Sequence, residues 1–341
     1  RSFCGIGGFH QALESLGHEC VFASDIDKHC RDTYEKNYKI KPAGDITLIK
    51  ESDIPKHDII CAGFPCQSFS KSGNRMGIND PRGTLFFDIL RIAKFHQPKY
   101  LILENVRNLA GHDQGRTWET IHSNLVNIGF SVKAKPIIFS PHYLGIPQNR
   151  ERVFILCQRE DLGEVPDFDF NFEKNVDCSI DSILSTDNKI KDISKYQLNK
   201  EQVKLLDYWN EFIQNIEKPL PGFPVWADRL KDLDPDENIE GYAKWERTFI
   251  IKNNALYKKN KPFIDKWLKK SDKIELFKGS KAMFEWQAGQ IDNPDIWNTI
   301  MHFRPSGIRV KKPTYFPALV AITQTSIVGK LKRFITPREA S

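Results

Sequence analysis

Residues 58–70 read DIICAGFPCQSFS, and this stretch decides the fold assignment. Its first half is a short apolar run with the length of a buried strand. Its second half turns at glycine and proline into a mostly polar loop that contains a cysteine. In α/β proteins, ligands bind beyond the carboxyl ends of the parallel strands. Cys66 therefore lies where this architecture places reactive groups, although a cysteine taken alone is more often an inert, buried side chain.

Short apolar runs and amphipathic stretches alternate on both sides of this segment. The expected strands are Cys20 to Ala23, Asp58 to Ala62, Tyr100 to Leu103 and Val153 to Cys157. The expected helices are Phe9 to Leu16, His29 to Asn37, Leu85 to Phe95 and Thr117 to Ile128. This alternation predicts a doubly wound α/β sheet.

The pattern changes after about residue 160, where residues 161–172 are acidic and aromatic and read as a linker. The periodicity is weak from there to about residue 325. We therefore expect a catalytic and cofactor-binding domain over residues 1–164 and a second, smaller domain over 165–325. Residues 326–341 would form a segment that returns to the first domain.

Composition narrows the class of protein. With 341 residues, 40% of them hydrophobic and 28% charged, the chain has an ordinary globular composition. No apolar run approaches the roughly 20 residues that span a bilayer, and no signal peptide is visible, so we expect a cytoplasmic protein without a membrane partner. The net charge of +6 is compatible with a nucleic-acid partner but does not establish one. Seven cysteines without C-x-x-C spacing argue against a disulfide framework and against a metal site.

A glycine cluster and two acids indicate a nucleoside ligand. Residues 3–9, FCGIGGF, precede an amphipathic helix, and glycines there would let the backbone approach a ligand closely. A tight strand-to-helix turn explains the same glycines equally well. Asp25, at the end of an expected strand, suits a ribose diol, and Asp45 suits an adenine amino group. An exposed Asp is also a common cap or turn residue.

An acid and two arginines follow further along the chain. Glu104 ends the apolar run 101–103, at the same expected edge of the sheet as Cys66. Arg150 and Arg152 are two residues apart and point the same way if the backbone is extended. A helix cap is the alternative role for Glu104, and a surface ion pair with Glu151 is the alternative for the arginines.

Together these motifs resemble the cytosine-5 DNA methyltransferase family, in its bacterial restriction-modification form. The resemblance covers residues 1–157 and 333–339. It rests on segments 5–8, 64–67, 80–87, 104–106 and 148–152, which occur in the order that the family shows. It implies the methyltransferase fold, S-adenosylmethionine as cofactor and double-stranded DNA as substrate. It also implies a monomer with a possible cognate restriction endonuclease, and a target-recognition role for residues 165–325.

Residue roles follow from the resemblance. Cys66 would attack C6 of a flipped cytosine, Glu104 would bind or protonate N3, Arg152 would hold O2, and Arg150 would support the loop. The cofactor would contact Phe3, Gly5, Gly7, Gly8, Asp25, Ile26, Asp45, Ile46, Pro65 and Leu85. The DNA would contact Pro65, Gln67, Ser70, Arg304 and Arg309, with Arg247, Lys281 and Gln287 as further candidates.

This sequence departs from the family at three places. Cys4 stands where many relatives have serine, and Ile26 stands where an aromatic residue often stacks on adenine. The family's final cofactor motif does not follow residues 335–341, so we expect a clipped chain that binds cofactor weakly. Two alternatives remain, an RNA methyltransferase of the same superfamily and a catalytically silent DNA-binding regulator. The long segment after residue 165 favours duplex DNA, and the presence of Cys66, Glu104 and Arg152 argues against a silent protein.

Overall fold

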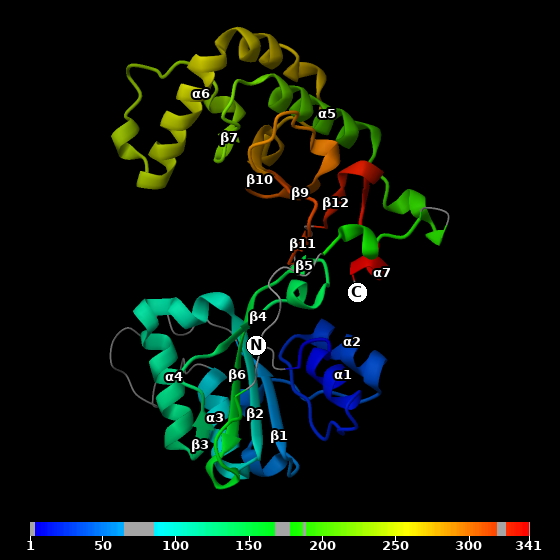
Figure 1. The fold of residues 1–341 in the computed structure, drawn as a ribbon, viewed down its shortest axis with the longest axis vertical. Helices are drawn as coiled ribbons and strands as arrows, with labels where there is room; N and C mark the ends of the chain where they lie inside the picture. The colour runs from blue at the N-terminus through cyan, green and yellow to red at the C-terminus, as the bar shows by residue number, and fades with distance from the viewer. Residues whose placement is uncertain (1–3, 65–84, 168–177, 187–188, 319–324, 341) are drawn as a thin grey trace. The chain divides into compact units, whose positions relative to one another are not determined.

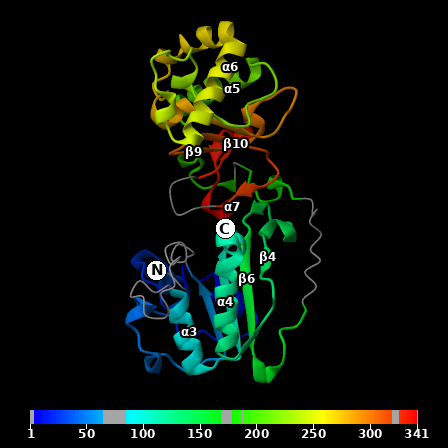
Figure 2. The same cartoon turned by 90° about the vertical axis from the view of Figure 1, so that its left-hand side faces the viewer.

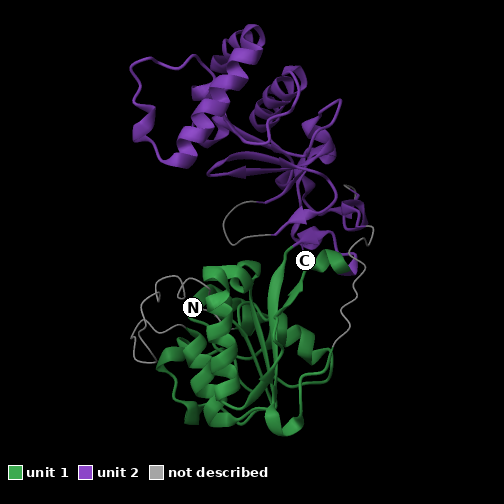
Figure 3. Ribbon diagram, turned by 60° about the vertical axis from the view of Figure 1, so that its left-hand side comes forward, with its two compact units in different colours: residues 1–143, 150–174 green, residues 144–149, 175–341 purple. Residues whose placement is uncertain are grey.

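A computed structural model describes residues 4–64, 85–167, 178–186, 189–318 and 325–340. The chain divides into two compact units, unit 1 with residues 1–143 and 150–174, and unit 2 with residues 144–149 and 175–341 (Figure 3). The expected return segment, 326–341, groups with unit 2, because strand β12 (Ile327–Val328) pairs with β9 (Ile300–Arg304) and with β13 (Arg333–Phe334).

Unit 1 has the α/β architecture expected from the sequence. Its helices are α1 (Gly8–Glu14), α2 (Lys28–Tyr38), α3 (Leu85–His96) and α4 (Arg116–Asn127). Its strands are β1 (Ile59–Gly63), β2 (Tyr100–Val106), β3 (Phe130–Val132), β4 (Ile137–Phe139) and β6 (Arg152–Arg159). Figure 1 shows α3 and α4 along one side of this sheet and α1 and α2 along the other, and Figure 2 shows α3 and α4 face on.

The sheet of unit 1 is mixed. Its order is β1-β2-β6-β3, with β4 also paired to β6; β1 and β2 run parallel, whereas β6 runs antiparallel to β2. A strand that runs antiparallel to its neighbours begins at the edge of the sheet where those neighbours end. The beginning of β6 therefore lies at the carboxyl edge of β1 and β2.

The expected strand over residues 20–23 is not formed. The next residue, Ser24, makes an isolated parallel bridge to Ala43. A cavity of about 420 Å³ is lined by residues 18–24 and also by residues 58–62 of and beside β1. Both stretches line this cavity, and no backbone ladder joins them in the described part of the chain.

Unit 2 is built on a different sheet. It contains helices α5 (Lys200–Asn215), α6 (Lys244–Leu268) and α7 (Pro337–Ala340). Its remaining strands are β5 (Gln148–Asn149), β7 (Pro224–Trp226), β8 (Met283–Gln287), β10 (Gly307–Lys311) and β11 (Phe316–Pro317). The larger sheet has the order β13-β12-β9-β10-β8-β7, and β5 and β11 form a separate parallel pair. An aromatic core joins helices to sheet, with Trp209 of α5 stacked on Phe284 of β8 at 4.8 Å between ring centroids.

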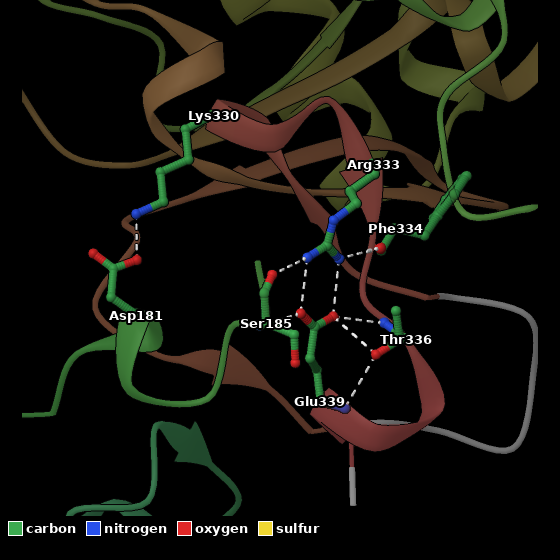
Figure 4. Close-up of polar contacts among 7 residues, drawn as sticks. All are labelled: Asp181, Ser185, Lys330, Arg333, Phe334, Thr336 and Glu339. Carbon is green, nitrogen blue, oxygen red and sulfur yellow. Dashed lines mark hydrogen bonds and ion pairs between the residues drawn. The ribbon is translucent and has the colours of Figure 1, made fainter. Parts of the chain in front are cut away.

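A fully buried ion pair closes unit 2 near its last residues (Figure 4). Both terminal nitrogens of Arg333 donate to the two carboxylate oxygens of Glu339, at 2.8 and 2.9 Å. The same carboxylate accepts from the backbone N–H groups of Thr336 and Ser185, each at 2.8 Å. Thr336 and Glu339 form a capping box at the start of α7. The Glu339 carboxylate thus joins its own segment to Ser185, 154 residues earlier in the chain.

Candidate active site

An acid and a guanidinium meet at the carboxyl edge of the unit 1 sheet. Val106, the last residue of β2, lies opposite Arg152, the first residue of β6. Arg152 Nε lies 2.8 Å from Glu104 Oε1, and the two side chains are 21% and 28% exposed. They are therefore paired with each other while both remain accessible to a ligand.

Arg150 adds a second cation beside this pair. Its backbone N–H donates to Ser140 Oγ at 2.9 Å, and Ser140 is fully buried. Burial lowers the pKa of Arg150, the neighbouring charge of Arg152 lowers it further, and Glu104 acts in the opposite direction. Two guanidinium groups thus lie near one carboxylate, which favours an electron-rich ligand atom at this edge. The Glu151 carboxylate pairs with Arg107, Oε2 to Nη1 at 2.5 Å, whereas its backbone carbonyl accepts from Arg152 Nη1 at 2.8 Å.

The loop with the expected nucleophile starts next to Glu104. Gly63 lies opposite Glu104 in the β1–β2 register, and a Cβ on Gly63 would come within 3.2 Å of Glu104 Oε2. The side chain of Asn105, which is 2% exposed, donates to the carbonyl oxygen of Phe64 at 2.8 Å. This bond fixes the chain two residues before Cys66. Pro65, Cys66, Gln67 and Ser70 themselves lie outside the described residues, as does Phe3.

Three segments of the expected nucleoside site are hydrogen-bonded side by side. Cys4 N donates to Ser24 O at 3.1 Å, and Gly5 N donates to Asp25 Oδ2 at 2.8 Å. The second and third segments are joined by Ser24 Oγ, which donates to the carbonyl oxygen of Gly44 at 2.7 Å. The structure therefore brings together the glycine turn and the turns that carry Asp25 and Asp45. The two helices expected between these segments are present as α1 and α2, whereas the expected strand before Asp25 is not formed.

The glycine turn is held by a buried carboxylate. Asp25 is 1% exposed, and its other oxygen accepts from Asp27 N at 2.9 Å. Gly5 and Gly7 have φ values of +52° and +101°, and a Cβ on Gly7 would overlap the Tyr38 ring. Glycine is required at position 7, both by its φ and by the contact. Gly8 begins α1, and a Cβ added to it would meet open space.

The surroundings of this turn fit a nucleoside. Ile26 is 45% exposed and offers an apolar surface for a purine ring. Asp45 accepts from Thr47 N and Thr47 Oγ1, at 3.0 and 2.8 Å, and the N–H bond helps to lower the pKa of its carboxyl. Ile46 is buried, and Leu85 of α3 packs against the cluster to which Ile46 belongs. Backbone turns, an acid and exposed apolar surface are the chemistry that an adenosine group requires.

The expected DNA-contacting arginines belong to unit 2. Arg304 ends β9 and Arg309 lies in the middle of β10, and both face Glu285 of β8. Gln287 also donates to Glu285. Arg247 lies on helix α6, outside these strands, and pairs with Glu240. Lys281 precedes β8 in a short helical turn.

Sequence reasoning missed Asn105 and Ser140, which position the site without being expected to touch a ligand. Only Asn105 had a signal in the sequence. Leu101 and Leu103 alternate with exposed or half-buried residues along β2, so Asn105 occupies the buried phase of the strand. A polar side chain in the buried phase needs a hydrogen-bond partner.

Within the described ranges, no group of His, Cys, Asp or Glu side chains could hold a metal ion, and no helix is both long and apolar enough to cross a bilayer.

Comparison with known proteins gives consistent matches. A family model described as C-5 cytosine-specific DNA methylase matches residues 2–341. The Type II methyltransferase M.AluI of Cellulosimicrobium cellulans is 34% identical over 99% of this chain and 83% of its own length. M.HhaI of Haemophilus parahaemolyticus is 44% identical over 55% of this chain and 57% of its length. M.HpaII of Haemophilus parainfluenzae is 50% identical over 47% of this chain and 46% of its length. This chain therefore spans most of the first relative and about half of the other two.

Proposed function

The chain belongs to the C-5 cytosine-specific DNA methylase family, and we propose that it methylates C5 of a flipped cytosine within a specific short duplex DNA site. The observation that carries the proposal is the Glu104–Arg152 pair at 2.8 Å, beside the anchored start of the Cys66 loop. N3 and O2 are neighbouring acceptors on one edge of cytosine. A carboxyl and a guanidinium that already touch each other match that spacing.

Cytosine C5 is a poor nucleophile, so the ring has to be activated. The thiolate of Cys66 adds to C6, and negative charge develops on the N3–C4–C5 system of the ring. Glu104 delivers a proton or a hydrogen bond to N3, while Arg152 binds O2. C5 then gains enamine character and can take a methyl group. Loss of the proton at C5 returns an electron pair to the ring, which expels the sulfur of Cys66 and restores the double bond between C5 and C6.

S-adenosylmethionine supplies the methyl group when it is bound. Gly5 and Gly8 would leave room for it, Gly7 and Asp25 would hold the glycine turn in shape, and Ile26 would cover the purine. Asp45, Ile46 and Leu85 would complete that side. Phe3 and Pro65 keep the role that the family resemblance implies.

The target base is inaccessible in a stacked duplex, so it has to be extruded, at a cost of a few kcal/mol. Contacts between DNA and unit 2 would offset this cost, with Arg304 and Arg309 among them. Because the similar proteins are Type II methyltransferases, we propose that the modified site is one that a cognate restriction endonuclease cuts. Gln67 and Ser70 would contact the DNA from the Cys66 loop.

A covalent trap tests the proposal. The test uses a long duplex copied with 5-fluorocytosine, so that every site carries the analogue, together with S-adenosylmethionine. Fluorine replaces the hydrogen at C5 and cannot leave as a cation, so the sulfur is not expelled, and we expect an adduct that survives denaturing electrophoresis. Cys66→Ala should give no adduct. Cys61→Ala is the matched control and should retain it, because burial raises the pKa of that thiol to about 12.

Other outcomes contradict the proposal. Trapping on 5-fluorocytosine RNA but not on DNA would show an RNA enzyme. Tight duplex binding without any adduct would show a silent DNA-binding protein. Bisulfite sequencing of DNA treated with the active chain would identify the recognition site.

A further inference from the structure

One side of the unit 2 sheet carries a cluster of polar and charged side chains, which we call the Glu285 face. It consists of Glu285 and Gln287 on β8, His302 and Arg304 on β9, and Arg309 and Lys311 on β10. Arg309 lies directly opposite Glu285 in the parallel β8–β10 register and opposite His302 in the antiparallel β9–β10 register. Alternation along each strand places these residues on one side.

The opposite side of the same strands is used by the core. Phe284, Trp286, Met301, Ile308 and Val310 alternate with the charged residues, and all five are at most 2% exposed. On the other side, Ile300 of β9 is buried in a smaller apolar cluster with Phe316 and Val328, and the polar residues of the Glu285 face belong to neither cluster. The Glu285 face therefore needs another explanation than core packing.

The Glu285 face has more positive than negative charge. Arg309 Nε and Nη2 both lie 2.7 Å from Glu285 Oε2, and Arg304 Nη1 lies 3.7 Å from the same oxygen. Two guanidinium groups thus share one carboxylate, and Lys311 adds a third cation. Burial lowers the pKa of Lys311, and the charges of Arg309 and Arg304 lower it further.

Arg304 is incompletely satisfied. Its Nη1 is buried and has no hydrogen-bond partner among the described residues. Burial lowers the pKa of Arg304, and the charge of Arg309 lowers it further. A buried donor without an acceptor is costly, and an anionic or acceptor-rich ligand would relieve both the missing bond and the repulsion.

The net positive charge of the chain also lies in unit 2. Unit 1 contains equal numbers of basic and acidic residues, so the surplus of six positive charges lies in unit 2. A polyanion would be attracted to unit 2 as a whole. That attraction explains affinity but not discrimination between sequences.

We propose that the Glu285 face reads base edges of duplex DNA, and that Glu285 is a positioning residue that holds Arg309 in the orientation for a bidentate contact with guanine. This inference rests on the proposed function. Glu285 occupies the Nε–Nη2 edge of the Arg309 guanidinium, and the edge formed by the two terminal nitrogens is the one that suits O6 and N7 of guanine in the major groove. A guanidinium fixed in this way loses less freedom on binding.

The test selects bound duplexes from a library with random base pairs, using the full chain, and sequences them. Arg309→Lys keeps the charge but removes the planar fork. We expect its preference at one base pair to fall about 5- to 150-fold, with unchanged salt dependence of binding to random duplex. Glu285→Gln is isosteric, and it should relax the preference at that same base pair.

Glu237→Gln is the matched control, because Glu237 is a similarly shielded acid, 17% exposed, paired with Arg229 in the same unit. It should leave the selected motif unchanged. Thermal unfolding followed by tryptophan fluorescence establishes that each variant is folded. An unchanged motif in both Glu285→Gln and Arg309→Lys would overturn the inference, as would an equal loss of affinity for every sequence. Failure of the proposed function is separable, since it appears as the absence of the Cys66 adduct in the wild-type chain.

Discussion

Replacing Glu339 with glutamine should destabilise unit 2 by about 3 kcal/mol. Burial of Glu339 disfavours its charged form, but the hydrogen bonds from Arg333, Thr336 and Ser185 outweigh burial and lower the pKa of its carboxyl from 4.5 to about 2. A shift of this size corresponds to about 3 kcal/mol of stability. The side chains of Arg333 and Glu339 are 0% exposed, so solvent does not screen the interaction. Removing one partner of such a pair typically costs about 3–5 kcal/mol, because the other charge stays buried.

The sign of the pH dependence follows from the lowered pKa. The stabilisation is fully present above the unfolded pKa of about 4.5 and is lost as the pH falls towards 2. The difference in stability between wild type and Glu339→Gln should therefore be largest near neutral pH. It should shrink in acid, where the wild-type carboxyl is itself protonated.

Urea unfolding followed by tryptophan fluorescence suits this measurement. Every tryptophan except Trp118 lies in unit 2, so the signal reports mainly on that unit. Asp181→Asn is the control, because its pair with Lys330 is 59% and 46% exposed (Figure 4) and should contribute at most about 1 kcal/mol. Equal losses for Glu339→Gln and Asp181→Asn would refute the reasoning.

Two further predictions concern unit 1. Asn105→Leu removes the donor to the Phe64 carbonyl, which then lacks this buried partner. We expect the rate of methyl transfer in a single turnover to fall about 10-fold or more, with cofactor affinity unchanged. An unchanged rate would contradict a positioning role for Asn105. Asp25→Asn replaces one of the two acceptors used by Gly5 N and Asp27 N with a donor. Titration calorimetry should show S-adenosylmethionine binding weakened about 10-fold, with DNA binding unaffected.

The sequence predicted the parts of unit 1 that depend on local pattern. The helices over 28–38, 85–96 and 116–127 and the strands ending near Gly63 and Val106 were expected to within a few residues. Apolar runs followed by glycine, proline or an acid locate strand ends, because the chain has to leave the sheet there. The family was also predicted correctly from the order of the motifs.

Features that depend on pairing between distant segments were not predictable in this way. The contact between Glu104 and Arg152 requires β6 to run antiparallel to β2, and neither segment specifies its direction. Residues 20–23 have a strand-like composition, but a strand also requires a partner, and no ladder forms there in the described part of the chain. Unit 2 combines short strands with an aromatic core, and its weak periodicity concealed both.

The hexapeptide 144–149 leaves unit 1 only to pair with unit 2, through β5 and β11. Phe316 N donates to Pro147 O at 2.7 Å, and the register joins Gln148 to Phe316. A hybrid enzyme that takes only residues 175–341 from a second parent would therefore receive β11 without its own pairing strand, β5. Exchange of sequence specificity between such proteins should succeed more often when the donor's hexapeptide is transplanted with its second unit. Such an exchange therefore needs three junctions in the chain: one on each side of residues 144–149 and one near residue 174.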